Sequence, residues 1–210
     1  MRAVRWVIAI VVAAGICWAF PLFHVVTLKQ AKAEKAAATF NPTQFAETFW
    51  TEKLLPALAG AVKADELIAA IETNPADAKQ KFAHSIGLSE GYYYFLRGEG
   101  KILSVSDDEV ILAVTAGTTN AEVALQAGLL FGNALRDGTG LINANSYPNS
   151  QDFNDISAAL NHIVESTVQT KLREQAKVGG KISFVGCAEV GDEATDLKPL
   201  KVIPIQTKAE

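Results

Sequence analysis

The stretch YYYFLRGEGKIL, residues 92–103, marks the point at which the chain changes from a helical to a strand-like hydrophobic pattern. It is dense in aromatic and aliphatic residues and is interrupted by Gly98 and Gly100. Such runs are typical of β-strands, and a glycine inside one marks a bend or bulge. We therefore predict a first strand over residues 92–103, bent at the glycines.

The residues that follow predict four more strands and one long helix. Further strands are expected at residues 110–115, 121–127, 181–190 and 198–207. Between the third and fourth strands, an apolar stripe at helical spacing extends from Phe153 to Leu172. This order matches the five-stranded oligonucleotide/oligosaccharide-binding (OB) barrel, an α+β fold in which the helix between strands three and four plugs the barrel bottom. A ferredoxin-like or other α+β sandwich is the alternative, because one sequence does not give the order of strands in space.

The residues before the first strand predict short helices. An apolar stripe begins after Asn41-Pro42, where asparagine can cap a helix and proline can occupy its first turn, and Pro56 should bend or end this helix. A second helix is expected at residues 65–73, and the repeated signal Asn74-Pro75 starts a third that runs to about His84. The predicted organisation is a signal-anchor segment at 1–28, a stalk at 29–39, a helical subdomain at 40–90 and an OB-like β-barrel domain at 91–210.

The N-terminal leader contains an uncharged run over residues 6–28, preceded by two arginines and followed by three lysines. As a helix this run would reach about 34 Å, enough to cross a bilayer core of roughly 30 Å. It can be an uncleaved membrane anchor, a cleaved signal peptide, or a lipoprotein signal acylated at Cys17. Because the branched Ile16 stands where a lipoprotein signal needs a small residue, lipidation of Cys17 is disfavoured and the uncleaved anchor is favoured. Each alternative places the body in the periplasm, at the bacterial inner membrane.

The charge distribution excludes a nucleic-acid partner. Residues 1–35 carry five Lys/Arg and one acidic residue, which leaves 14 basic against 22 acidic groups and a net charge of −8 on the remainder. Nucleic-acid binding depends on the neutralisation of phosphates by basic groups, so a body of this sign would repel them.

One polar constellation is a candidate ligand or partner site. It contains Arg136 and Asp137 in the run 132–138, followed by Asn154 and Asn161 in the expected helix. The planar guanidinium can clamp a ligand carboxylate, or it can form a structural ion pair with Asp137, Asp152 or Asp155. The ion pair is the favoured interpretation.

Two acidic clusters are weak candidates for metal ligands. Asp107 and Asp108 lie between the first two predicted strands, and Asp192 and Asp196 between the last two. Neither cluster has calcium-loop spacing, and charged hairpin turns explain both, so we expect no metal site. The scattered histidines and Cys187 complete no catalytic set, so we expect neither a cofactor nor an enzyme, with His162 solvated and Cys187 buried.

Several short motifs, in their order and spacing, resemble an uncharacterised bacterial family of predicted periplasmic lipoproteins (domain of unknown function 2291). The resemblance spans about residues 15–207 and rests on Phe40-Asn41-Pro42 with Phe45, Trp50 with Lys53-Leu54-Leu55-Pro56, Gly98-Glu99-Gly100, the run 132–137, Asp152-Phe153-Asn154 and Ser183-Phe184-Val185-Gly186. Similar proteins tend to be encoded beside sugar-type ABC importers, which implies an accessory role at such a transporter. The family has no assigned catalytic residues.

These observations lead to one expected function and two alternatives. We expect a membrane-anchored periplasmic accessory or binding protein, held by residues 6–28, whose partners are sugar ABC transporter components or a small solute. A small-molecule enzyme with a polar pocket around Arg136 and the helix start at 152–161 is the first alternative. A structural envelope spacer is the second.

Overall fold

A computed structural model describes residues 40–85, 91–143 and 150–209. The predicted anchor at 6–28, Cys17 and the stalk at 29–39 lie outside these residues. Within the described ranges, no helix combines the length and apolar character that a bilayer crossing requires. Asn41–Glu210 forms one compact unit.

Helices precede, interrupt and flank the strands. In chain order they are α3 (Pro42–Phe49), the π-helical turn η1 (Trp50–Leu54), α4 (Leu55–Ala57), the 3₁₀ turn η2 (Leu58–Gly60), α5 (Ala64–Thr73), α6 (Pro75–Phe82), α7 (Ala134–Asp137), α8 (Ser150–Ile163), the π-helical turn η4 (Val164–Val168), α9 (Gln169–Gln175) and α10 (Glu193–Asp196). The three predicted N-terminal helices are confirmed, and the cap signals act as expected: Asn41 Oδ1 accepts from Gln44 N, and Asn74 Oδ1 from Ala76 N.

The strands form one six-stranded sheet, so the expected strand count of five is wrong by one. The strands are β1 (Val62–Lys63), β2 (Tyr92–Val105), β3 (Glu109–Ala113), β4 (Val123–Gln126), β5 (Lys181–Val190) and β6 (Leu200–Ala209). The additional strand is β1, which lies between the first two predicted helices. Its two residues pair in parallel with Leu96 and Arg97 of β2, a length too short to leave a period-2 signal in the sequence.

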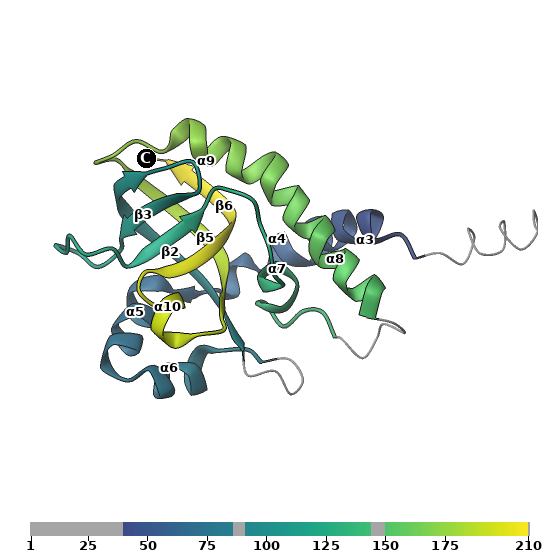
Figure 1. Cartoon of the computed structure of the whole chain (residues 1–210), viewed down its shortest axis with the longest axis horizontal. Coiled ribbons are helices and arrows are strands. Elements are labelled where there is room, and N and C mark those ends of the chain that lie inside the picture. Colours follow the sequence, from purple (N-terminus) through teal and green to yellow (C-terminus); the bar gives the residue numbers. More distant parts are fainter. Residues whose placement is uncertain (1–39, 86–90, 144–149, 210) are drawn as a thin grey trace, which may run out of the picture. The chain divides into compact units, whose positions relative to one another are not determined.

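The order of the sheet is β1-β2-β3-β4-β6-β5, and β2 also pairs with β5. The hydrogen-bonded pairings therefore run in a circuit from β2 through β3, β4, β6 and β5 back to β2. The β2–β5 ladder is antiparallel and joins ten residue pairs, from Tyr92↔Val190 to Lys101↔Lys181. This mixed α+β arrangement contains the predicted strand and helix order, with the long helical run between β4 and β5 (Figure 1).

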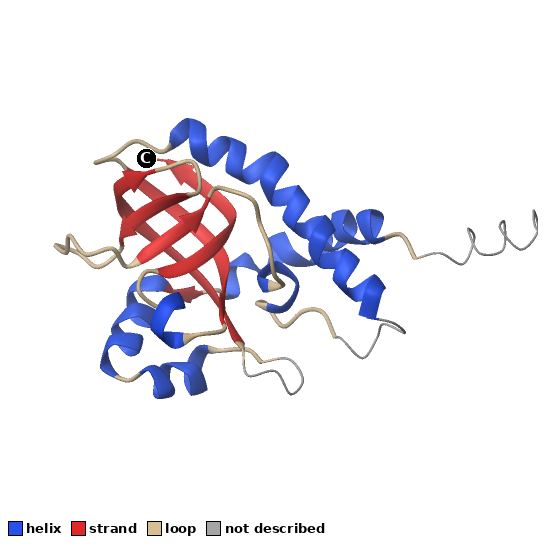
Figure 2. Cartoon of the chain, in the orientation of Figure 1, coloured by secondary structure: helices blue, strands red, loops and turns tan. Residues whose placement is uncertain are grey.

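The core lies inside the strand circuit and takes side chains from helices at both of its ends. Leu67 of α5 and Leu172 of α9 are fully buried in the same cluster as Leu96, Leu112 and other strand residues. Figure 2 shows α5 and α6 below the strands and the end of the long helical run above them. Within the long helical run, η4 and α9 pack against β6, whereas α8 packs along α3.

Gly98 is needed where α5 approaches β2. A Cβ atom at this position would lie 2.7 Å from the Cβ of Ala64 and 3.4 Å from the ring of Phe184. Besides the bend predicted from the sequence, Gly98 thus has a second role, because it allows α5 to approach β2 closely. Ala64 is fully buried by this contact.

The long helical run is not a simple α-helix, because its stripe of buried residues has a strict four-residue period. Ile156, Leu160, Val164, Val168 and Leu172 are all buried. On an α-helix each four-residue step rotates the stripe by about 40°, so four steps would carry Leu172 to nearly the opposite side from Ile156. The wider π turn η4 (Val164–Val168) winds the stripe back. The predicted helix is therefore present, with a π turn that was not expected.

Candidate functional site

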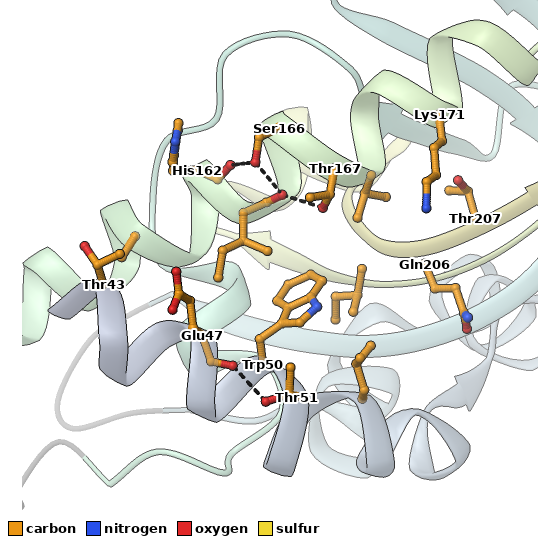
Figure 3. Close-up of a pocket in the computed structure, with 15 residues that line it drawn as sticks. Thr43, Glu47, Trp50, Thr51, His162, Ser166, Thr167, Lys171, Gln206 and Thr207 are labelled. Atoms are coloured by element: carbon orange, nitrogen blue, oxygen red, sulfur yellow. Dashed lines mark hydrogen bonds between the residues drawn. The ribbon is translucent and has the colours of Figure 1, made fainter.

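A cleft of about 700 Å³ lies between the N-terminal helices and the long helical run. One wall is formed by α3 and η1, the other by α8, η4 and α9, and the end of β6 closes the side (Figure 3). We call it the Trp50 cleft. Its lining residues are Thr43, Glu47, Trp50, Thr51, Leu55, Ala159, His162, Ile163, Ser166, Thr167, Val168, Lys171, Ile205, Gln206 and Thr207.

Both π-helical turns of the described chain border the Trp50 cleft. Trp50 and Thr51 belong to η1, and Ser166, Thr167 and Val168 belong to η4. Single π turns inside α-helices are rare and occur frequently at functional sites, where they change the direction of particular side chains. Both turns therefore help to set the direction of side chains that line the cleft.

Trp50 lies at the centre of the cleft, as Figure 3 shows, and is 9% exposed. Its indole ring is therefore held by the fold while one part of it remains accessible from the cavity. Within the described chain no acceptor receives a hydrogen bond from its Nε1, so the N–H can donate to a ligand. A fixed aromatic surface with one polar atom suits a ligand that has both an apolar face and polar edges.

Three of the five hydroxyl groups that line the cleft donate to the helix backbone. Thr51 Oγ1 donates to Glu47 O at 3.0 Å, Ser166 Oγ to His162 O at 2.7 Å, and Thr167 Oγ1 to Ile163 O at 2.6 Å. Because the hydroxyl protons are used by the helix backbone, the remaining lone pairs can only accept. These oxygens therefore suit a ligand rich in O–H or N–H donors.

The cleft carries one carboxylate and one ammonium group. In Figure 3 Glu47 lies on one side of the Trp50 ring and Lys171 on the other. Neither forms an ion pair with any described residue. His162 points away from the cavity and its side chain is 79% exposed, which confirms the expectation of a solvated histidine. With a neutral histidine the lining has no net charge, so it favours a neutral ligand over an ionic one.

The structure places Arg136 and Asp137 together, but not in a cavity. Arg136 Nε and Nη2 donate to the two oxygens of Asp137 at 2.6 and 2.7 Å, and Nη1 donates to Phe153 O at 2.9 Å. The guanidinium also stacks 3.5 Å from the centre of the Phe153 ring. Arg136 and Asp137 are 5% and 2% exposed. Of the acceptors considered, Asp137 receives the arginine, and the pair joins α7 to α8.

The two predicted asparagines both lie on α8 but differ in exposure. Asn154 is exposed on α8. Asn161 is buried, and its Nδ2 donates to Gly132 O at 3.3 Å, while its Oδ1 has no partner among the described atoms. The candidate residues therefore do not converge on one open site, and their role as ligand contacts stays a prediction.

A neighbouring polar network that the sequence did not suggest fixes the segment before α7. Asn133 N donates to Glu189 Oε2 at 3.0 Å, Tyr93 Oη donates to Glu189 Oε1 at 3.4 Å, and Ser157 Oγ donates to Asn133 Oδ1 at 2.9 Å. Burial, together with the carboxylates of Glu189 and Asp137, raises the pKa of the Tyr93 phenol. The Tyr93 phenol therefore keeps its proton and donates it to Glu189. The network holds the segment before α7 against β2 and β5.

The acidic clusters occupy turns. Asp107 and Asp108 lie exposed in the β2–β3 turn. Asp192 Oδ1 accepts from Ala194 N at 2.9 Å, and Asp196 Oδ2 accepts from Gly191 N and Asp192 N at 3.0 and 2.9 Å. No group of three or more potential metal ligands occurs in the described part of the chain.

Asp196 and Cys187 are both held in environments that perturb their ionisation. Partial burial acts to raise the pKa of Asp196, but the backbone hydrogen bonds and the Lys201 ammonium outweigh it and lower that pKa. Cys187 is fully buried, as expected, and burial raises the pKa of its thiol.

The residues of the Trp50 cleft were not recognised in the sequence. Trp50 was named only among the residues of the family resemblance and His162 only as a solvated histidine, and Glu47, Lys171 and Gln206 were not singled out. Two signals were available: the strict four-residue spacing of the buried stripe, and the hydroxyl residues Ser166 and Thr167 on the same helix. Neither signal shows that two elements more than 100 residues apart in the chain face one cavity.

Comparisons with known proteins complete the description. A family model described as "Predicted periplasmic lipoprotein (DUF2291)" matches residues 7–208. The crystal structure of an OB-fold protein from Thermotoga maritima is similar to this chain, with a TM-score of 0.72 and 25% identity over 82% of this chain and 99% of that one. No match was found among curated proteins.

Proposed function

The chain belongs to the DUF2291 family of predicted periplasmic lipoproteins, and from that premise we propose that it is a non-catalytic accessory protein of the bacterial inner membrane that binds a small neutral solute. The solute is a sugar or similar polyol, and the binding site is the Trp50 cleft. The body acts in the periplasm, tethered by residues 6–28 or by a lipid on Cys17.

The observation that carries this proposal is the composition of the cleft around Trp50. A sugar ring has an apolar face that can stack on an indole, and hydroxyl groups that can donate to the carboxylate of Glu47 and to acceptor hydroxyls such as Thr51 Oγ1. The Gln206 amide and the Lys171 ammonium can supply donors in return. A cleft of about 700 Å³ is large enough for a mono- or disaccharide.

We further propose that the protein works beside a sugar-type ABC uptake system, which is the role that the family resemblance implies. In this proposal the protein presents or senses the solute beside the transporter and performs no reaction on it.

Tryptophan fluorescence provides a specific test. The chain has three tryptophans, of which Trp6 and Trp18 lie in the leader. In a Trp6→Phe/Trp18→Phe chain, Trp50 is therefore the sole reporter. We expect the addition of millimolar monosaccharides or disaccharides to change its emission and to raise the melting temperature, because a ligand that binds only the folded state stabilises it.

Two matched glutamate variants distinguish binding in the Trp50 cleft from unspecific effects of the added sugar. Glu47→Gln should weaken the response, whereas Glu52→Gln should not, since Glu52 follows in the next turn but does not line the cleft. If no sugar in a broad panel changes either signal, solute binding in this cleft is wrong. An equal effect of the two glutamate variants would also contradict the site.

The same measurements distinguish the two alternatives. An enzyme built around Arg136 would bind its substrate without perturbing Trp50, and the binding would be lost in Arg136→Lys while the melting temperature stayed high. A structural spacer would show no ligand response at all. The Arg136 guanidinium already donates to Asp137 and to the Phe153 carbonyl, so we favour the Trp50 cleft over a site at Arg136.

A further inference from the structure

From the loop that leads from β4 to α7 we infer a second functional surface, a docking site for a partner protein that has an apolar groove bordered by basic side chains. We call residues 127–132 the docking loop. None of its residues lines the Trp50 cleft, so this inference stands independently of the proposed solute.

The docking loop exposes two large apolar side chains. Leu129 is 78% exposed and Phe131 is 79% exposed, more than any other large apolar residue of the described chain. Leu130 between them is 6% exposed and anchors the loop. Burial of a leucine or phenylalanine side chain is favourable, and aromatic residues that fill a partner's pocket dominate many interfaces.

The backbone of the docking loop is fixed by side chains from the long helical run. Leu130 N donates to Glu165 Oε1 at 2.9 Å. Gln169 Nε2 donates to Gln126 O at 3.2 Å and to Gly128 O at 2.9 Å. Arg173 Nη1 donates to Ala127 O.

The β2–β3 turn holds the docking loop from the other side. Asp108 O accepts from Ala127 N at 2.7 Å and from Gly128 N at 3.0 Å. A Cβ at Gly128 would lie 2.6 Å from Asp108 Oδ1 and 3.2 Å from Asp108 Cα, so glycine favours this close approach of the two turns. The exposed side chains thus project from a loop ordered before any partner binds, which lowers the entropic cost of association.

The charges beside the docking loop select the kind of partner. Asp108 and Glu109 line a shallow concavity together with Leu129 and Phe131, and Asp107 is exposed in the same turn. No ion pair within the described residues compensates these three carboxylates. The one lysine of the concavity, Lys201, is paired with Asp196 at 3.2 Å. An acidic border repels anionic lipid headgroups and complements lysines or arginines around an apolar groove.

Site-specific photocrosslinking in the native host tests this surface with the full chain in its membrane. p-Benzoylphenylalanine replaces Phe131, and the control places it at Val178, which is 68% exposed in the turn before β5. We expect an adduct with a different protein from position 131 and none from position 178. Leu129→Ser should reduce the yield of the adduct about tenfold, because it removes one of the two apolar contacts.

Charge reversal completes the test. Asp107→Lys/Glu109→Lys should reduce the yield similarly, while the melting temperature stays within 2 °C of the parent chain, about the shift expected of exposed side chains. An adduct with lipid, a dimer of the chain itself, equal yields from positions 131 and 178, or no adduct would each overturn the inference. So would a yield that is insensitive to charge reversal.

Discussion

Removal of the Asp137 carboxylate should strongly destabilise the folded body, because it leaves the buried Arg136 guanidinium without its counter-charge. In Asp137→Ala the guanidinium of Arg136 stays 5% exposed but loses two hydrogen bonds of 2.6 and 2.7 Å. It keeps the Phe153 carbonyl and the Phe153 ring. A buried cation would then lack its counter-charge.

The magnitude follows from this geometry. Removal of one partner of a buried ion pair costs about 3–5 kcal/mol, because the remaining charge has no compensation. Asn41–Glu210 is a compact unit of a size for which 1 kcal/mol shifts the melting temperature by about 2–4 °C. The expected decrease in melting temperature is therefore roughly 10 °C.

Urea unfolding and thermal melting of residues 41–210 measure the effect. Asn154→Ala is the matched control, because Asn154 is exposed on α8 and should change stability by less than about 0.5 kcal/mol. The double variant Arg136→Met/Asp137→Ala should recover more than half of the loss, since both charges are then gone. A single variant that melts within 2 °C of the parent, about the effect of an exposed substitution, or a double variant that is less stable than either single one, would refute a structural ion pair.

Three further outcomes are expected. Gly98→Val should destabilise the body by about 1–3 kcal/mol in urea unfolding, because the new Cβ would lie 2.7 Å from the Cβ of Ala64. If no loss of stability is measured, α5 is free to move away from β2. In a Cys17→Ala chain, Cys187 should react with a disulfide reagent only after urea unfolding, since burial raises the pKa of its thiol; rapid reaction of the folded chain would contradict this. The lowered pKa of Asp196 means that its contribution to stability is present above the unfolded-state pKa and is lost as the pH falls through the folded-state value. Asp196→Asn should therefore be less stable than the parent at pH 7 and equal to it near pH 2, as measured by melting temperature.

Local signals predicted the elements of the fold well. The Asn41-Pro42 and Asn74-Pro75 motifs start helices, and both asparagine side chains accept the backbone hydrogen bonds expected of caps. The strands around the glycine-broken stretch 92–103 were recognised because alternation and aromatic content are local properties. The parallel pairing of β1 with β2 depends instead on a contact between distant residues, which no local pattern encodes.

The candidate site was harder to predict than the fold. Arg136 was singled out because its planar guanidinium can clamp a carboxylate, and the favoured ion pair is formed with Asp137, but the burial of both residues was not predicted. The Trp50 cleft is formed by side chains from α3, η1, α8, η4, α9 and β6, and no local pattern in these segments shows that they face one another. A cavity is a property of the space between elements, so it becomes visible only when their arrangement is known.

The long β2–β5 ladder bears on how the chain folds. Tyr93 and Glu189, joined across this ladder, are 96 residues apart in the chain. Contacts of such large sequence separation form slowly, because a long segment must be ordered before they stabilise anything. Nearly the whole polypeptide must therefore be available before this ladder can form, so a chain that lacks its C-terminal third cannot close the sheet.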